Sequence, residues 1–347
     1  LLQTAYNYEE RGQRVLLIKA VVDTKGEDFV VSRLGVSRRV DLLVDADDDL
    51  RALVRRRALA GAMAGVILAG CAPQGPHQPA AHPTPPPHLR SRGASVDPSL
   101  RPAPGDLSIP AAFSYTDSEG EDSDCIFYAA ADVPAGLVVY LDGDGQPFHG
   151  QGDQSPSARS RGGLAGTGGV VEAAGARGYD VVSVRSPGDD EAWWLDDQDA
   201  KVRYLEEALD YVAIECGANT EQVWLVGYSG GSEFVSQWFF PAYAERMAGG
   251  GFVLFGGGDA PESGAATFSD DVKERLRLNW VTGTRDVPSD SADGFDGIGR
   301  ARNSLAYYRS AGFRHTWSEW PDDDHGSITE KFGHYVGRVL DAAASGK

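Results

Sequence analysis

The stretch that decides the fold is Val223–Gly231, which reads VWLVGYSGG. Its first four residues form an apolar run of strand type, and the residues over Gly230–Arg246 follow a helical pattern. Between the two lies the pentapeptide G-x-S-x-G, whose small residues allow a strand and a helix to meet at a sharp turn. Such a turn exposes the serine hydroxyl beside a helix N-terminus. We therefore predict that Ser229 is a nucleophile rather than part of an incidental glycine-rich turn.

Outward from this stretch, strand-like and helical segments alternate from Leu107 to the C-terminus. The strand-like runs are Cys125–Ala129, Leu137–Leu141, Asp180–Val184, Val223–Val226, Gly251–Phe255, Leu278–Val281 and Arg314–Trp320. The helical patterns are Leu164–Ala176, Asp196–Glu215, Gly230–Arg246, Ser269–Leu276, Gly297–Ser310 and Gly326–Ala344. Because strands alternate with helices, we predict an α/β fold whose mostly parallel sheet is covered by helices on both faces.

A serine hydroxyl needs a base before it can act as a nucleophile. Three histidines follow Ser229, and only His325 lies in a loop between a strand and a final helix, in the segment PDDDHG. His315 falls within a strand-like run and His334 within a helical pattern, which are ordinary places for a histidine. We therefore predict that His325 is the base.

An acid partner should follow the preceding strand, because serine, acid and histidine occur in that order along the chain in this kind of site. The segment NWVTGTRD reads as a strand, a glycine turn and then Asp286. We predict that Asp286 orients the imidazole, with Asp290 and Asp293 of the same loop as rivals.

The oxyanion of an acyl-transfer reaction needs two backbone N–H donors. Gly230, directly after the serine, is expected to provide one of them. The second is expected from the loop DGDG that follows Leu137–Leu141, and it is either Gly143 or Asp144. No further ligand spacing accompanies this acidic loop, so we predict neither a metal nor a cofactor.

With these residues in place, residues 106–347 resemble the α/β-hydrolase superfamily and, more loosely, secreted esterases related to polyester depolymerases and feruloyl esterases. The resemblance implies cleavage of a small or polymeric carboxylic ester through an acyl-enzyme; a peptidase, a thioesterase or an inactive binding protein are the alternatives. Many relatives carry His-Gly where this chain has Asp142-Gly143. Trp193 and Trp194 follow Asp180–Val184 and either line an acyl pocket or pack against a helix.

The 347-residue chain has a net charge of −19 that is distributed unevenly. Residues 1–70 carry 11 Lys+Arg and 10 Asp+Glu and have a net charge of +1, so all of the net negative charge belongs to the rest of the chain. A nucleic-acid partner would need clustered Lys and Arg, so we predict none. The acidic surface is expected to keep a monomeric, exported domain soluble, or to reflect adaptation to high salt.

Residues 51–71 read as an export signal: Arg55–Arg57 precede the short apolar run Ala58–Gly70. The run ends in LAGC, which resembles the lipobox of bacterial lipoproteins, and this implies that Cys71 carries a lipid. Residues 72–105 are rich in proline and are expected to form an extended spacer. The predicted location is the cell envelope, on the outer face of the bacterial cytoplasmic membrane.

Residues 1–50 resemble part of the bacterial thymidine kinase family. The matching segments are Tyr6–Tyr8, Glu10–Gly12, Lys19, Asp23 and Ser32–Gly35. The chain has no G-x-x-x-x-G-K-[ST] loop to hold phosphates and none of that family's paired C-x-x-C zinc motifs. We predict no kinase activity, and we interpret this segment as an extended or fused reading frame with a true start near Leu50 or Val54.

The chain has three cysteines. If Cys71 is lipidated, Cys125 and Cys216 remain in an exported and therefore oxidising environment. They are expected either to form a disulfide or to be two buried thiols.

Overall fold

The computed structural model describes residues 100–149, 160–261, 266–291 and 294–346, together with Val40 and five short strands between residues 16 and 69. The chain divides into two compact units, residues 1–87 and residues 88–347. Each unit is described by itself below.

The unit of residues 1–87 is described mainly through its strands. A parallel sheet has the order β4-β1-β5, and β2 pairs with β3 in antiparallel fashion. The bounds are β1 (Leu16–Ala20), β2 (Phe29–Val31), β3 (Ser37–Arg39), β4 (Leu42–Val44) and β5 (Val66–Ala69). Strand β5 lies within the apolar run Ala58–Gly70, whereas Cys71 and residues 72–99 of the predicted spacer lie outside the described residues.

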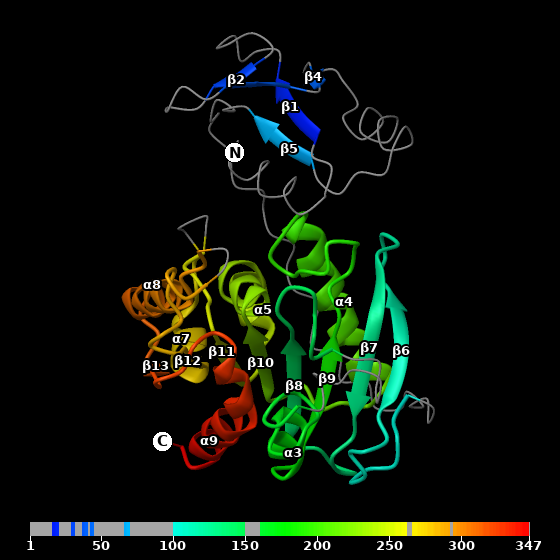
Figure 1. Ribbon diagram of the computed structural model, residues 1–347. Helices are drawn as coiled ribbons and strands as arrows, with labels where there is room; N and C mark the ends of the chain where they lie inside the picture. The colour runs from blue at the N-terminus through cyan, green and yellow to red at the C-terminus, as the bar shows by residue number, and fades with distance from the viewer. Residues whose placement is uncertain are drawn as a thin grey trace. The chain divides into compact units, whose positions relative to one another are not determined.

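An eight-stranded sheet forms the centre of the second unit, with the order β13-β12-β11-β10-β8-β9-β7-β6 (Figure 1). The six strands from β13 to β9 in that order are parallel, and β7 and β6 continue the sheet in antiparallel fashion. The bounds are β6 (Ala111–Thr116), β7 (Asp122–Tyr128), β8 (Gly136–Leu141), β9 (Tyr179–Val184), β10 (Val223–Tyr228), β11 (Gly250–Phe255), β12 (Arg277–Val281) and β13 (His315–Glu319). The predicted fold class is confirmed.

The helices of this unit are α3 (Val170–Gly175), α4 (Gln198–Glu215), α5 (Gly230–Phe234), α6 (Phe240–Tyr243), α7 (Asp270–Arg275), α8 (Gly297–Ser310) and α9 (Phe332–Ala344). The segment predicted to be helical over Gly230–Arg246 is helical throughout, but a π-helical segment, Val235–Phe239, divides its α-helical parts and a 3₁₀ turn, Ala244–Arg246, ends it. Pro241 lacks the backbone N–H that a continuous helix would use. Among the described residues, no helix is both long and apolar enough to cross a bilayer.

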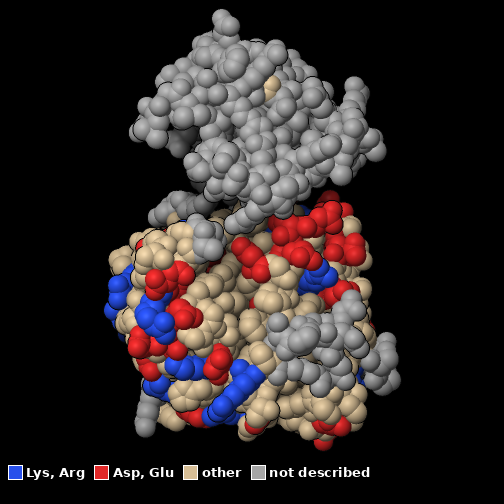
Figure 2. Space-filling model, viewed as in Figure 1, with Lys and Arg blue, Asp and Glu red and all other residues tan. Residues whose placement is uncertain are grey.

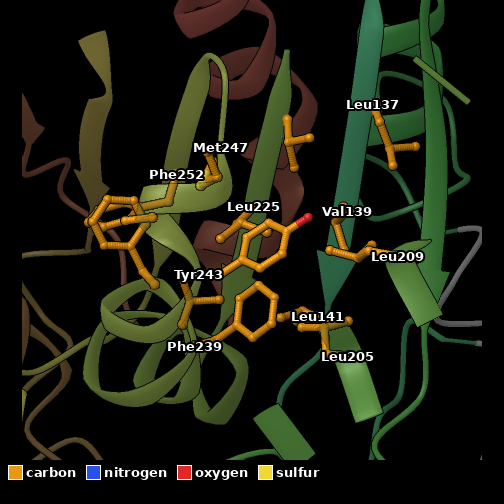
Figure 3. Close-up of a cluster of buried hydrophobic side chains, with 14 of the residues drawn as sticks. Leu137, Val139, Leu141, Leu205, Leu209, Leu225, Phe239, Tyr243, Met247 and Phe252 are labelled. Carbon is orange, nitrogen blue, oxygen red and sulfur yellow. The ribbon is translucent and has the colours of Figure 1, made fainter. Parts of the chain in front are cut away.

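Two apolar clusters lie on opposite faces of the sheet. Along β8, Leu137, Val139 and Leu141 join one cluster, while Val138 and Tyr140 join the other. Figure 3 shows the first cluster, in which β8 faces Leu205 and Leu209 of α4 and Phe239 and Tyr243 of the α5–α6 region. The second cluster packs α3 and α9 against the other face. Because both faces are covered, the central strands are apolar throughout, as the sequence predicted.

The disulfide considered between Cys125 and Cys216 is not formed. Both cysteines are buried in the first apolar cluster as thiols. Cys125 has a hydrogen bond with the Tyr204 hydroxyl, and burial raises the pKa of its thiol to about 12. A thiol so strongly held in its protonated form is a poor nucleophile for thiol exchange.

Candidate active site

Ser229 lies at a strained turn between β10 and α5. Its φ of 50° and ψ of −119° place a non-glycine residue in a region that few such residues adopt. A Cβ at Gly227 would lie 2.8 Å from the backbone of Ser232, and one at Gly231 would lie 2.2 Å from the carbonyl oxygen of Leu141. The glycines around the serine are therefore required by the close approach of strand, turn and helix.

The structure brings the three residues predicted for catalysis into one hydrogen-bonded chain. Nε2 of His325 lies 2.9 Å from Oγ of Ser229, and its Nδ1 lies 2.8 Å from Oδ2 of Asp286. The serine follows β10, the aspartate follows β12 and the histidine follows β13. These strands are parallel, so their carboxyl ends meet at one edge of the sheet.

Aromatic rings fix the orientation of His325. The ring of Tyr228 stacks on the imidazole at a centroid distance of 5.2 Å, and its hydroxyl donates to the carbonyl oxygen of His325 at 3.0 Å. Phe295 meets the imidazole edge-on at 5.4 Å. A Cβ at Gly256 would lie 3.1 Å from Cε1 of the imidazole, so the backbone immediately after β11 also lies against the ring.

Asp286 packs against the start of α8. Its side chain is 1% exposed, whereas that of His325 is 33% exposed. The N–H of Ile298 donates to the Asp286 carbonyl at 3.0 Å, and a Cβ at Gly297 would lie 2.3 Å from Oδ2. The buried acid therefore faces an imidazole that remains accessible from the solvent side.

The other histidines and aspartates considered for the base and the acid do not join this hydrogen-bonded chain. His315 begins β13, at the end of the strand opposite the site, and His334 is exposed on α9. Asp290 is exposed and accepts a hydrogen bond from Ser289, while Asp293 lies outside the described residues.

The loop after β8 lies directly over the serine and is organised by the carboxylate of Asp142. A Cβ at Gly143 would lie 3.0 Å from Cβ of Ser229. The buried Asp142 carboxylate accepts the N–H groups of Gly143, Phe148 and His149 at 2.8, 2.5 and 2.8 Å. Burial outweighs these bonds and raises the pKa of the carboxyl to about 6. The buried acid Asp142 therefore shapes this loop.

The two adjacent tryptophans, for which the sequence predicted the same alternatives, have different surroundings in the structure. Trp193 is fully buried and stacks on Phe234 at 5.0 Å, so it does not line the site. Trp194 is half-buried, and its Nε1 donates to both carboxylate oxygens of Asp144 at 2.9 and 3.0 Å. A Cβ at Gly230 would lie 2.1 Å from Oδ1 of Asp144 and 2.6 Å from Cδ1 of Trp194. Gly230, Asp144 and Trp194 therefore meet beside the serine.

Sequence reasoning missed a buried ion pair behind the nucleophile. Glu233, one turn after Ser229, accepts from Nε and Nη2 of Arg300 at 2.9 and 2.8 Å. The guanidinium carbon of Arg300 lies 5.7 Å from the ring centroids of both Trp194 and Phe295. The position of Glu233 on the first turn after the serine was a signal that could have been noticed; nothing in the sequence pointed to Arg300.

No family model matches the chain. A stretch of 57 residues is 46% identical to a thymidine kinase of Rhizobium meliloti (strain 1021), covering 16% of this chain and 29% of that protein. A stretch of 69 residues is 36% identical to a thymidine kinase of Ruegeria pomeroyi, covering 20% of this chain and 34% of that protein. The chain spans about a third of the length of these curated relatives, and a short resemblance to thymidine kinases is confirmed.

Several solved structures are similar at low sequence identity. Poly(aspartic acid) hydrolase-1 from Sphingomonas sp. KT-1 is 15% identical, with 67% of this chain and 98% of that chain covered and a TM-score of 0.44. A Pyrococcus furiosus esterase is 13% identical, with 72% and 97% covered and a TM-score of 0.45. An esterase from Pyrobaculum calidifontis is 13% identical, with 71% and 85% covered and a TM-score of 0.45. The α/β-hydrolase fold of this chain is defined by its own parallel sheet and its strand–serine–helix turn.

Proposed function

We propose that residues 106–347 form a serine hydrolase that cleaves carboxylic esters. The observation that carries the proposal is the chain of two hydrogen bonds from Ser229 through His325 to Asp286, at 2.9 and 2.8 Å. This arrangement matches a nucleophile, a general base and an orienting acid in geometry and in chain order.

In the proposed reaction, Oγ of Ser229 attacks the ester carbonyl while Nε2 of His325 takes the hydroxyl proton. The buried carboxylate of Asp286 stabilises the imidazolium that forms. When the tetrahedral intermediate collapses, His325 gives the proton to the leaving alcohol. A water molecule, deprotonated by the same imidazole, then attacks the acyl-enzyme and releases the carboxylic acid.

Backbone N–H groups of Gly230 and Asp144 are the proposed donors to the oxyanion. Gly230 is the first residue of α5, directly after the nucleophile. The N–H of Gly143 donates to Oδ1 of Asp142 at 2.8 Å, which favours Asp144 as the second donor. The bond from Trp194 to the Asp144 carboxylate supports this loop conformation.

The test compares each proposed residue with a matched control of the same type. Ser229→Ala should abolish turnover of p-nitrophenyl esters and labelling by a fluorophosphonate probe, whereas Ser310→Ala, an exposed position on α8, should change neither. His325→Gln should reduce kcat by several orders of magnitude, whereas the exposed His334→Gln should not. Full turnover or labelling in Ser229→Ala would contradict the proposal.

A substrate panel distinguishes the alternatives that share this machinery. Esters, thioesters and peptide amides of the same acyl group should be compared by kcat/KM, and the proposal expects the oxygen ester to be preferred. Preference for the amide would indicate a peptidase. A fully folded protein that reacts with no acyl substrate and no fluorophosphonate would indicate a binding protein.

We also propose that the chain is anchored to the cell envelope through a lipid on Cys71. The support is the sequence alone, because Cys71 lies outside the described residues. Mass spectrometry of the protein extracted from membranes should find a diacylated N-terminal Cys71. An unmodified Cys71 within a longer peptide would contradict the anchor.

A further inference from the structure

We propose that a cavity at the β12–β13 edge of the sheet binds a small organic anion that combines a carboxylate with an aromatic ring. The cavity has a volume of about 510 Å³, which is within the size range of small-molecule sites. It lies between α9 and the sheet face that carries Arg277 and Asn279 of β12 and His315 and Trp317 of β13. The inference does not rest on the proposed ester hydrolysis.

The strand register places this cavity away from the serine. His315 of β13 pairs with Arg277 of β12, and Arg277 pairs with Gly251 of β11. Gly251 in turn pairs with Trp224 of β10, so the cavity lies at the level of Trp224 along the strands. Trp224 precedes Ser229 by five residues, which corresponds to about 16 Å along a strand. The two strands that line the cavity, β12 and β13, are two and three positions across the sheet from β10. A ligand bound there would occupy a separate site.

The walls of the cavity carry more positive than negative groups. The guanidinium groups of Arg277, Arg314 and Arg338 line it, against the single carboxylate of Asp341. That carboxylate is bound by Nε and Nη2 of Arg177 at 2.7 and 2.6 Å. In a chain with a net charge of −19, this lining is unusual and favours an anionic ligand.

Two of these arginines also hold glutamates outside the cavity. Arg314 binds Glu274 at 2.6 Å and Arg338 binds Glu319 at 2.7 Å, in both cases through Nη1. A guanidinium has five N–H donors in a planar fork, so such a contact fixes the group without using all of its donors. Figure 2 shows Lys and Arg over the region of α9, interspersed with Asp and Glu, and a denser gathering of Asp and Glu near the opposite end of this unit.

The aromatic and apolar residues that line the rest of the cavity favour a ligand with an aromatic ring. Trp317 is half-buried, and the guanidinium carbon of Arg338 lies 5.2 Å from its ring centroid. Val339 and Ala342 of α9 provide apolar surface beside it. An aromatic carboxylate would place its ring against Trp317 and its charge on the guanidinium groups.

Calorimetric titration of the full chain with benzoate tests the proposal, with benzamide as the uncharged probe and acetate as the probe without a ring. Benzoate should bind saturably with a Kd of about 1 mM or tighter, and both other probes should bind at least about tenfold more weakly. Arg338→Gln should weaken benzoate about tenfold. Ala342→Phe, which fills the cavity from a half-exposed helix position, should abolish binding while far-UV circular dichroism stays unchanged.

Two controls locate the binding. Arg302→Gln removes an exposed arginine that also lies over a tryptophan, Trp320 at 5.5 Å, but outside the cavity; it should leave benzoate affinity unchanged. Ser229→Ala should likewise bind benzoate as the wild type does, whatever the outcome of the hydrolase assays. The absence of saturable benzoate binding, or unchanged affinity in folded Ala342→Phe, would overturn the proposal.

Discussion

Replacing Arg300 with leucine should destabilise the protein, and should do so more at alkaline than at acidic pH. Arg300 is 30% exposed and its partner Glu233 is fully buried. Removing one partner of a buried ion pair costs about 3–5 kcal/mol, because the other charge is left uncompensated. Glu233 would keep two donors, the N–H of Gly258 at 2.9 Å and Nε2 of Gln237 at 2.6 Å. We therefore expect a loss of about 2–3 kcal/mol at pH 8.

The pH dependence follows from the protonation of Glu233. Burial raises the pKa of this carboxyl above its ordinary value of 4.5, and Arg300 opposes that rise. Without Arg300 the folded-state pKa rises further, while the unfolded-state pKa does not change. The penalty for the buried charge is therefore present above the folded-state pKa and disappears as the pH falls toward 4.5.

Urea unfolding at pH 8 and pH 5 measures this effect. Adding Glu233→Gln to Arg300→Leu removes the buried charge but keeps a carbonyl acceptor for Gly258, so it should restore most of the loss at pH 8. Arg246→Leu breaks an exposed pair with Asp210 and should cost less than about 1 kcal/mol. An Arg300→Leu protein as stable as wild type at pH 8, or no recovery on adding Glu233→Gln, would refute the reasoning.

Three further predictions follow from the same geometry. Asp286→Asn should reduce kcat by roughly 10³–10⁴-fold, because the imidazole loses its orienting carboxylate, whereas Asp290→Asn should be nearly neutral in the same ester assay. Gly231→Ala should lower the free energy of unfolding by about 1–3 kcal/mol, because its Cβ would meet a backbone carbonyl at 2.2 Å; Gly326→Ala, with 3.6 Å to its nearest neighbour, should not. Burial lowers the pKa of His149 to about 4 from 6.5, so stability should fall as the pH drops from 6.5 to 4, by about 3 kcal/mol from this group, and His149→Asn should remove that contribution.

Each of these has a result that would contradict it. Equal losses of activity in the two aspartate variants would mean that Asp286 has no special role. Gly231→Ala unfolding at the wild-type urea concentration would show that the turn has room for a methyl group. An unchanged pH slope in His149→Asn would mean that this histidine does not remain neutral as the protein is acidified.

The meeting of Ser229, His325 and Asp286 could be predicted from the sequence because each is marked by residues close to it in the chain. A strand–serine–helix turn lies within nine residues, and the other two residues lie in the loops that follow β12 and β13. Parallel strands bring their carboxyl ends together, so the local signals were enough to predict that the three side chains meet. Strand β6 was missed because its residues alternate between buried or half-buried and exposed, without a continuous apolar run.

The tertiary structure alone decided the features that depend on contacts between distant residues. Trp193 and Trp194 are adjacent in the sequence and of the same type. In the structure, Trp193 packs against Phe234 in the core, whereas Trp194 lies beside the serine and donates to Asp144. The pair between Glu233 and Arg300 joins residues 67 positions apart. The cavity beside α9 likewise exists only where a helix meets the edge of the sheet. Periodicity and motifs report which residues are neighbours along the chain; burial and charge pairing arise from neighbours in space, which no local pattern encodes.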